Sequence, residues 1–192
     1  MDKWVNTRRN NERRENYMVD ILDYVEKRKE EIKNELIRLN GLEKPKLTVI
    51  QIGNDKASSS YIKSKRKLCE KIGVEFKHLH IENYENISER DVAMKILDES
   101  YDLSVSGIIL QLPIPDKYDV NHLQREICLN KDVDGFRVRS EFIPCTPKGI
   151  MYLLKEEGIE LEGKNVVVVG RSILVGKPMM NLLINANATV TL

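Results

Sequence analysis

Short apolar runs alternate with segments of helical periodicity along most of the chain. Runs rich in β-branched side chains occupy residues 47–52, 105–112 and 166–169. Residues 18–39, in contrast, carry apolar side chains three or four positions apart, the spacing of one helix face. A chain in which strands and helices alternate in this way predicts an α/β fold with a mainly parallel sheet.

Residues typical of helix ends mark the limits of these elements. Gly73 and Gly158 stand where helices are expected to end, and Ser88 opens a segment that resembles a capping box. Thr146 followed by Pro147 is typical of an N-cap with proline in the first turn. We therefore expect helices at residues 18–39, 58–72, 88–97, 147–158 and 177–185, and strands at residues 47–52, 75–81, 105–112, 166–169 and 189–192.

The same pattern divides the chain into two expected domains. Residues 1–145 are predicted to form an N-terminal α/β domain and residues 146–192 the start of a Rossmann-like nucleotide-binding domain. Residues 1–16 are rich in Arg and Asn and have no apolar core, so we expect them to be disordered rather than a targeting segment. No helix follows the last expected strand, residues 189–192, so we expect an incomplete second domain in a chain truncated at its C-terminus.

The net charge and the number of cysteines limit which binding partners and which cellular compartment are expected. Lys and Arg number 31 against 30 Asp and Glu, a net charge of +1, which argues against a nucleic-acid-binding surface. The three cysteines, an odd number at wide spacing, argue against a disulfide framework and a zinc site and suit a reducing compartment. No apolar run approaches the roughly 18 residues that span a bilayer, so we expect a cytoplasmic protein with no membrane partner.

A glycine-containing loop lies between an expected strand and an expected helix. Gly170 and Gly176 enclose it, with Arg171 and Lys177 as its cations. Such a junction suits an anion, because glycines let the backbone approach a phosphate and the helix N-terminus offers free N–H groups. The alternative is a simple tight turn. If the loop binds a dinucleotide, Arg171 favours NADP over NAD, since an Arg accommodates the 2′-phosphate.

Tyr61 and Lys65 lie four positions apart on an expected helix and therefore share a face. A phenol beside an amine can hold a lysine in place and help it to act as a proton shuttle. A pair on a solvated helix surface has the same spacing and is the simpler interpretation of these two residues alone. Short-chain dehydrogenases also use this spacing, but in them the pair follows the nucleotide loop, whereas here it precedes Gly170.

Three further polar residues stand at an expected strand end or in an expected turn. Gln111 ends a buried run, at the carboxyl edge of a parallel sheet where ligands bind in α/β proteins; it could equally bond a neighbouring loop. Asp132 and Asp134 precede Gly135, and a turn held by Asp–backbone hydrogen bonds is the alternative to a binding site there. These two carboxylates are too few for a metal site, so none is expected.

Five motifs in a fixed order make the chain similar to a known family, the bifunctional methylenetetrahydrofolate dehydrogenase/cyclohydrolases. The resemblance extends over roughly residues 47–192. The motifs are Tyr61-x-x-x-Lys65, Gln111-Leu-Pro113, Lys131-Asp-Val-Asp134-Gly135, Pro144-Cys-Thr-Pro147 and Gly170-Arg-Ser-x-x-Val-Gly-x-Pro178. Residues 136–141 are a shorter loop than relatives carry, and the segment before the first helix lacks the family's Gly-Lys start.

The resemblance implies a role for each motif in the first domain. Lys65 would be the catalytic lysine of the cyclohydrolase step, positioned by Tyr61 and kept suitably deprotonated by Gln111. Asp134 would accept hydrogen bonds from the pterin ring and fix the orientation of the folate. Tyr61 would also contact the substrate.

It also implies a cofactor and a reaction. Gly170, Arg171, Ser172 and Gly176 would bind NADP, with Arg171 and Ser172 facing its 2′-phosphate. The implied function is oxidation of 5,10-methylenetetrahydrofolate to the 5,10-methenyl form and hydrolysis of that to 10-formyltetrahydrofolate, in one-carbon metabolism and purine biosynthesis, by a homodimer. The alternatives are an inactive folate-binding or partner-pairing remnant of this family and a generic nucleotide-binding module.

Overall fold

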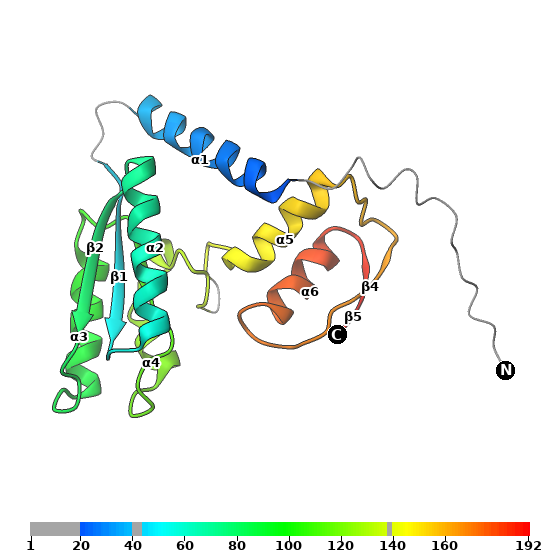
Figure 1. The fold of residues 1–192 in the computed structure, drawn as a ribbon. Coiled ribbons are helices and arrows are strands. Elements are labelled where there is room, and N and C mark those ends of the chain that lie inside the picture. The colour runs from blue at the N-terminus through cyan, green and yellow to red at the C-terminus, as the bar shows by residue number, and fades with distance from the viewer. Residues whose placement is uncertain (1–19, 40–43, 138–139) are drawn as a thin grey trace.

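The computed structural model describes residues 20–39, 44–137 and 140–192. Its first unit contains a parallel three-stranded sheet of order β2-β1-β3, in which β2 lies beside β1 (Figure 1). The strands of this sheet are β1 (Lys46–Ile52), β2 (Glu75–Ile81) and β3 (Gly107–Leu110). The helices of this unit are α2 (Lys56–Ile72), α3 (Glu89–Tyr101), α4 (Val120–Arg125) and a 3-10 turn, Leu129–Lys131. The expected α/β class with parallel strands is therefore confirmed.

Helix α2 matters most for the site, and both of its ends are set by local side-chain chemistry. The carboxylate of Asp55 accepts the N–H of Ser58 at 2.7 Å, which satisfies a donor that the first turn leaves free. Gly73 ends the helix in the left-handed conformation that glycine adopts without strain. Because Asp55 caps the helix, it begins at Lys56, two residues before the expected start.

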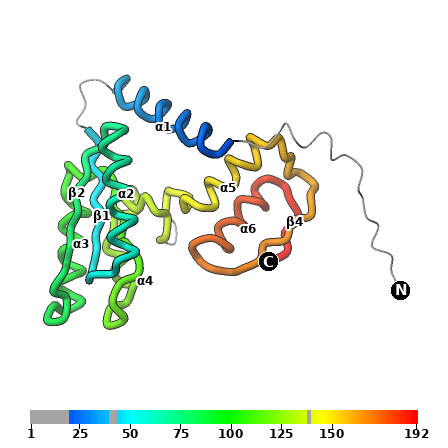
Figure 2. Tube along the Cα trace, in the orientation of Figure 1, coloured from blue at the N-terminus to red at the C-terminus, as the bar shows by residue number. Residues whose placement is uncertain are grey.

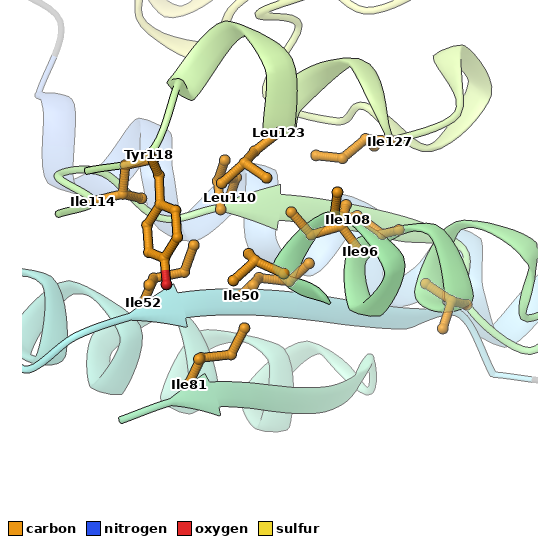
Figure 3. Close-up of a cluster of buried hydrophobic side chains, with 13 residues drawn as sticks. Ile50, Ile52, Ile81, Ile96, Ile108, Leu110, Ile114, Tyr118, Leu123 and Ile127 are labelled. Carbon is orange, nitrogen blue, oxygen red and sulfur yellow. The ribbon is translucent and has the colours of Figure 1, made fainter. Parts of the chain in front are cut away.

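The central strand β1 buries side chains on both faces. On one face a large apolar cluster joins it to β2, β3, α3 and α4, and Figure 3 shows these side chains interlocking between the strands and the helices. Its members are Ile50, Ile52, Ile81, Val92, Ala93, Ile96, Val105, Ile108, Leu110, Ile114, Tyr118, Leu123 and Ile127. On the other face Val49 and Ile109 pack with Ile62 of α2. Helix α2 is thus held directly against the sheet.

The second unit is smaller and more open. It contains a parallel pair, β4 (Asn165–Val167) with β5 (Thr189–Thr191), and two helices, α5 (Cys145–Glu156) and α6 (Gly176–Asn185). Residues 166–169 were expected to form a strand, and the strand observed there is shorter. The strand ends at Val167, whose side chain is 69% exposed, and Val169 is 98% exposed, because no described element packs over them.

Helix α1 (Ile21–Arg38) extends from the first unit toward α5 (Figure 2). Asp20 caps its N-terminus, Lys71 of α2 donates to its Glu26 at 2.7 Å, and the guanidinium of Arg28 lies over the Tyr152 ring of α5. The helix was expected from its apolar stripe, but none of its residues is buried. Its predicted beginning at Met18 and the glycine after it lie outside the described residues.

Other differences from the expected elements are local. Helix α3 runs to Tyr101, beyond its expected end, and Ser88 caps it by accepting the N–H of Asp91. Helix α4 and the 3-10 turn were not expected. Thr146 is not the N-cap of α5, because the helix already begins at Cys145 with Pro144 in the cap position. No helix in the described part of the chain is long and apolar enough to cross a membrane.

Candidate active site

The pairing of β1 with β3 places Gln111 at the carboxyl edge of the sheet. Ile50 stands opposite Leu110 in the parallel register, and the Gln111 N–H donates to the carbonyl of Ile50 at 2.9 Å. The side chain of Gln111 therefore points to the face that α2 covers, and the residue is only 9% exposed. The strand-end position predicted for Gln111 is confirmed.

Lys65 reaches this amide from helix α2. Its Nζ donates to Oε1 of Gln111 at 2.8 Å, across 46 positions of sequence. Nε2 of the same amide donates to the carbonyl of Leu112 at 2.9 Å, and that second bond fixes which end of the amide faces the lysine. Ser58 also donates to the Leu112 carbonyl, at 3.1 Å, and so ties the first turn of α2 to the same loop.

Tyr61 takes no part in the contact between Lys65 and Gln111. It lies one turn before Lys65 on α2, as expected, but its ring is 64% exposed. Among the residues that the structure describes, no hydrogen bond joins Tyr61 to Lys65. The structure therefore brings together Lys65 and Gln111 and leaves the phenol of Tyr61 exposed to solvent.

Asp134 faces Lys65 from the loop that follows the 3-10 turn. Burial raises the pKa of its carboxyl to about 6; the positive charge of Lys65 opposes this rise and the negative charge of Asp132 adds to it. An amine, a neutral amide and a carboxyl with a raised pKa thus meet beside one sheet edge, the type of grouping found where protons are handled.

Cys145 belongs to the same surroundings, although its position was not predicted as functional. Burial raises the pKa of its thiol, the charge of Asp134 adds to the rise, and Lys148 and Lys65 oppose it. A single cysteine has no partner residue at a characteristic spacing, so composition and spacing could not have indicated Cys145. Only its place in the motif Pro144-Cys-Thr-Pro147 could have done so.

The glycine loop of the second unit is tightly closed before α6. Gly170 has a φ of 118°, and a Cβ at Gly176 would collide with the carbonyl of Gly170. The Ser172 hydroxyl accepts the N–H groups of Val175 and Gly176 at 3.2 and 3.4 Å. Ser172 is therefore used to close the loop, and its hydroxyl proton remains available for another acceptor.

The residues of this loop fit a phosphate group. Arg171 and Lys177 are exposed, and in the described part of the chain neither side chain has an ion-pair partner. A cavity of about 650 Å³ lies beside the loop, lined by Arg171, Ser172 and apolar side chains of β4, α5 and α6. Two cations at the N-terminus of a helix, beside glycines that admit close approach, are suited to an anionic ligand. Within the described ranges, no group of three or more His, Cys, Asp or Glu side chains could hold a metal ion.

A parallel α/β unit with a lysine at its carboxyl edge, followed by a nucleotide-type glycine loop, defines a two-unit α/β protein of the nucleotide-binding type. Comparison with known protein families identifies the family within this class. Residues 20–134 match the catalytic domain of the tetrahydrofolate dehydrogenase/cyclohydrolases, and residues 144–192 match the NAD(P)-binding domain of the same proteins. The chain belongs to the tetrahydrofolate dehydrogenase/cyclohydrolase family.

Individual relatives agree with this assignment. The bifunctional protein FolD of Staphylococcus haemolyticus is 46% identical over 157 residues, which are 77% of this chain and 54% of the relative. The bifunctional protein FolD of Campylobacter hominis is also 46% identical, over 175 residues, 85% of this chain and 60% of the relative. The chain thus spans little more than half the length of these curated relatives.

Solved structures are similar in fold over most of the chain. The bifunctional FolD of Campylobacter jejuni aligns with a TM-score of 0.82 at 40% identity, over 88% of this chain and 63% of that one. The FolD of Trypanosoma brucei, complexed with NADP and an inhibitor, has a TM-score of 0.80 at 27% identity, over 88% and 61%. An NAD-dependent dehydrogenase from Saccharomyces cerevisiae has a TM-score of 0.71 at 27% identity, over 88% and 61%.

The raised pKa of Asp134 predicts a pH-dependent stability. Because the folded pKa of about 6 lies above the ordinary 3.8, the folded state binds the proton more tightly, and stability falls as pH rises between these values. The difference corresponds to about 3 kcal/mol. Asp134→Asn should remove this part of the dependence, so that urea unfolding shows a smaller loss of stability between pH 4 and pH 7 than in the wild type. The control is Asp98→Asn, which changes an exposed carboxylate of α3. Identical pH profiles of stability for Asp134→Asn and wild type would contradict the raised pKa of Asp134.

Proposed function

We propose that the chain carries the one-carbon site of a bifunctional enzyme that oxidises 5,10-methylenetetrahydrofolate and hydrolyses the resulting methenyl compound to 10-formyltetrahydrofolate. The observation that carries this proposal is the 2.8 Å contact between Lys65 Nζ and Gln111 Oε1 at the carboxyl edge of the sheet. Family membership supports the reaction class, and the position of the lysine supports the hydrolytic step.

Lys65 would handle the proton of the hydrolysis. Water adds to the cationic methenyl carbon and loses one proton, which gives a neutral carbinolamine. Its hydroxyl proton then passes to the departing nitrogen as one carbon–nitrogen bond breaks, and the formyl group stays on the other nitrogen. A neutral amine at Nζ can accept that proton, whereas an ammonium would repel the cationic substrate. Gln111 supports this role because its amide oxygen holds Nζ without the negative charge that would favour an ammonium.

Asp134 and Tyr61 would bind the folate. The Asp134 carboxyl is close enough to Lys65 for their charges to interact, so a pterin ring bound to it would bring the one-carbon bridge toward the lysine. The exposed ring of Tyr61 stands one turn from Lys65 on α2, where it can contact a bound substrate.

The dehydrogenase step requires NADP, which when bound supplies the hydride acceptor. Gly170 and Gly176 would let the phosphates approach the loop, Ser172 would close the loop and donate its free hydroxyl proton, and Arg171 would bind the 2′-phosphate. An NAD-dependent relative exists, so the choice of NADP rests on Arg171. We further propose tetrahydrofolate derivatives as the substrates, a homodimer and a cytoplasmic location, without nucleic-acid or membrane partners.

Substitution of Lys65 tests the hydrolytic assignment. Lys65→Met keeps the length of the side chain and removes its amine, so hydrolysis of 5,10-methenyltetrahydrofolate should fall by about 10²-fold or more, the usual scale for a general base. Dehydrogenase activity should survive in part. The assay follows the loss of methenyl absorbance.

The matched control is Lys63→Met, on the same helix but exposed and away from Gln111. It should keep the wild-type rate. Hydrolysis that is unchanged in Lys65→Met would contradict the assignment. Folate binding without any hydrolysis in the wild type would instead support the inactive folate-binding remnant.

Substitution of Arg171 tests the cofactor. Arg171→Ala should weaken NADP binding by roughly 1.5–3 kcal/mol, the range for a hydrogen bond to a charged group, and leave NAD binding nearly unchanged. Titration calorimetry with both nucleotides measures the difference, with Arg125→Ala on α4 as the control. Equal losses for NADP and NAD would show that Arg171 supports the loop and does not recognise the 2′-phosphate.

A further inference from the structure

Asp132 is a buried carboxylate next to the proposed folate site with no role assigned so far. It is 2% exposed, far less than most carboxylates. Its Oδ2 accepts the backbone N–H of Arg137 at 2.9 Å, five residues further along. The carboxylate therefore spans the turn that contains Asp134.

The backbone of Asp132 holds the same turn from the other side. Its carbonyl accepts the N–H of Gly135 at 2.9 Å and the hydroxyl of Ser140 at 3.2 Å. Asp132 is also paired with Ile108 of β3 in a parallel bridge, so it is fastened to the sheet that carries Gln111. The side chain and the main chain of one residue thus connect the Asp134 turn to the sheet.

The turn itself has little freedom to adopt another shape. Gly135 has a φ of 69°, and a Cβ there would collide with the carbonyl of Phe142. Because the turn is packed this closely, the direction of the Asp134 side chain depends on the anchor that precedes it.

We propose that Asp132 is a positioning residue for the one-carbon site: it holds the turn on which Asp134 is presented to the folate and supplies a fixed negative charge behind it. This rests on the proposed function for the identity of the ligand, but the placement of Asp134 can be measured without any ligand. Asp132 touches neither substrate nor cofactor in this account and acts through Asp134.

The charges around Asp134 make the two parts of this role separable. Lys65 of α2 favours its ionised form, Asp132 disfavours it, and Cys145 and Lys148 of α5 lie in the same electrostatic surroundings. Asp132→Asn keeps an oxygen that can accept the Arg137 N–H but removes the charge. Asp132→Ala removes both.

The test compares these variants with wild type and with Asp98→Asn as control. One measurement is the titration of the Asp134 carboxyl by ¹³C NMR in the free protein. The other is the affinity for 5,10-methenyltetrahydrofolate. In Asp132→Asn, Asp134 should titrate at a lower pH than in wild type, and affinity should stay within about threefold. In Asp132→Ala, affinity should fall by about tenfold or more, as expected when a hydrogen bond to a charged group is lost.

The outcomes separate this inference from the proposed function. An Asp134 titration that is the same in wild type and both variants would overturn the role of Asp132, whatever the ligand. Asp132→Ala with wild-type affinity would overturn it as well. If the wild type does not bind the folate but Asp134 titrates lower in Asp132→Asn, the proposed function fails while the electrostatic coupling of Asp132 to Asp134 stands. If Asp132→Ala does not fold, the titration of Asp132→Asn decides the matter alone.

Discussion

The hydrogen bond from the Gln111 N–H to the Ile50 carbonyl extends the pairing of β3 with β1 by one residue beyond the strand. Parallel pairing has a side-chain period of two, so this register decides which face of the sheet receives the Gln111 amide. A shift by one residue would turn the amide away from α2 and bury it among the apolar side chains of the opposite face. The contact with Lys65, and the proposed hydrolysis, depend on this register.

The chemical character of the partner matters as much as its position. A carboxylate at the end of β3 would place a negative charge beside Lys65, whereas the amide oxygen of Gln111 accepts the same hydrogen bond without a net charge. The carboxyl that does lie nearby, Asp134, has a pKa raised by burial and by Asp132. The site therefore combines the Lys65 amine with an uncharged amide in direct contact and a carboxyl whose pKa is raised.

Much of this arrangement could be predicted from the sequence, because it follows from local signals. Gly73 ends α2 as expected, and the buried run before Gln111 is β3. The prediction failed where distant packing decides. Val168 and Val169 were expected to belong to the strand but lie beyond the end of β4, and α4, with six residues, is too short to show helical periodicity. The burial of Asp132 was also not predictable, since an aspartate two residues before an Asp-Gly pair has the same local sequence in a buried turn and in an exposed one.

The central claim is that the hydrogen bond of Lys65 to an uncharged amide at the sheet edge supports the proposed hydrolysis. The most direct measurement is the rate at which Gln111→Glu hydrolyses 5,10-methenyltetrahydrofolate, compared with wild type. The substitution preserves the size of the side chain and an acceptor for Nζ, but it adds a negative charge and puts an oxygen in place of the Nε2 donor to the Leu112 carbonyl. The account therefore predicts a rate lower by about 10²-fold or more in a protein with an unchanged fold. A Gln111→Glu variant that hydrolyses the substrate at the wild-type rate would contradict it.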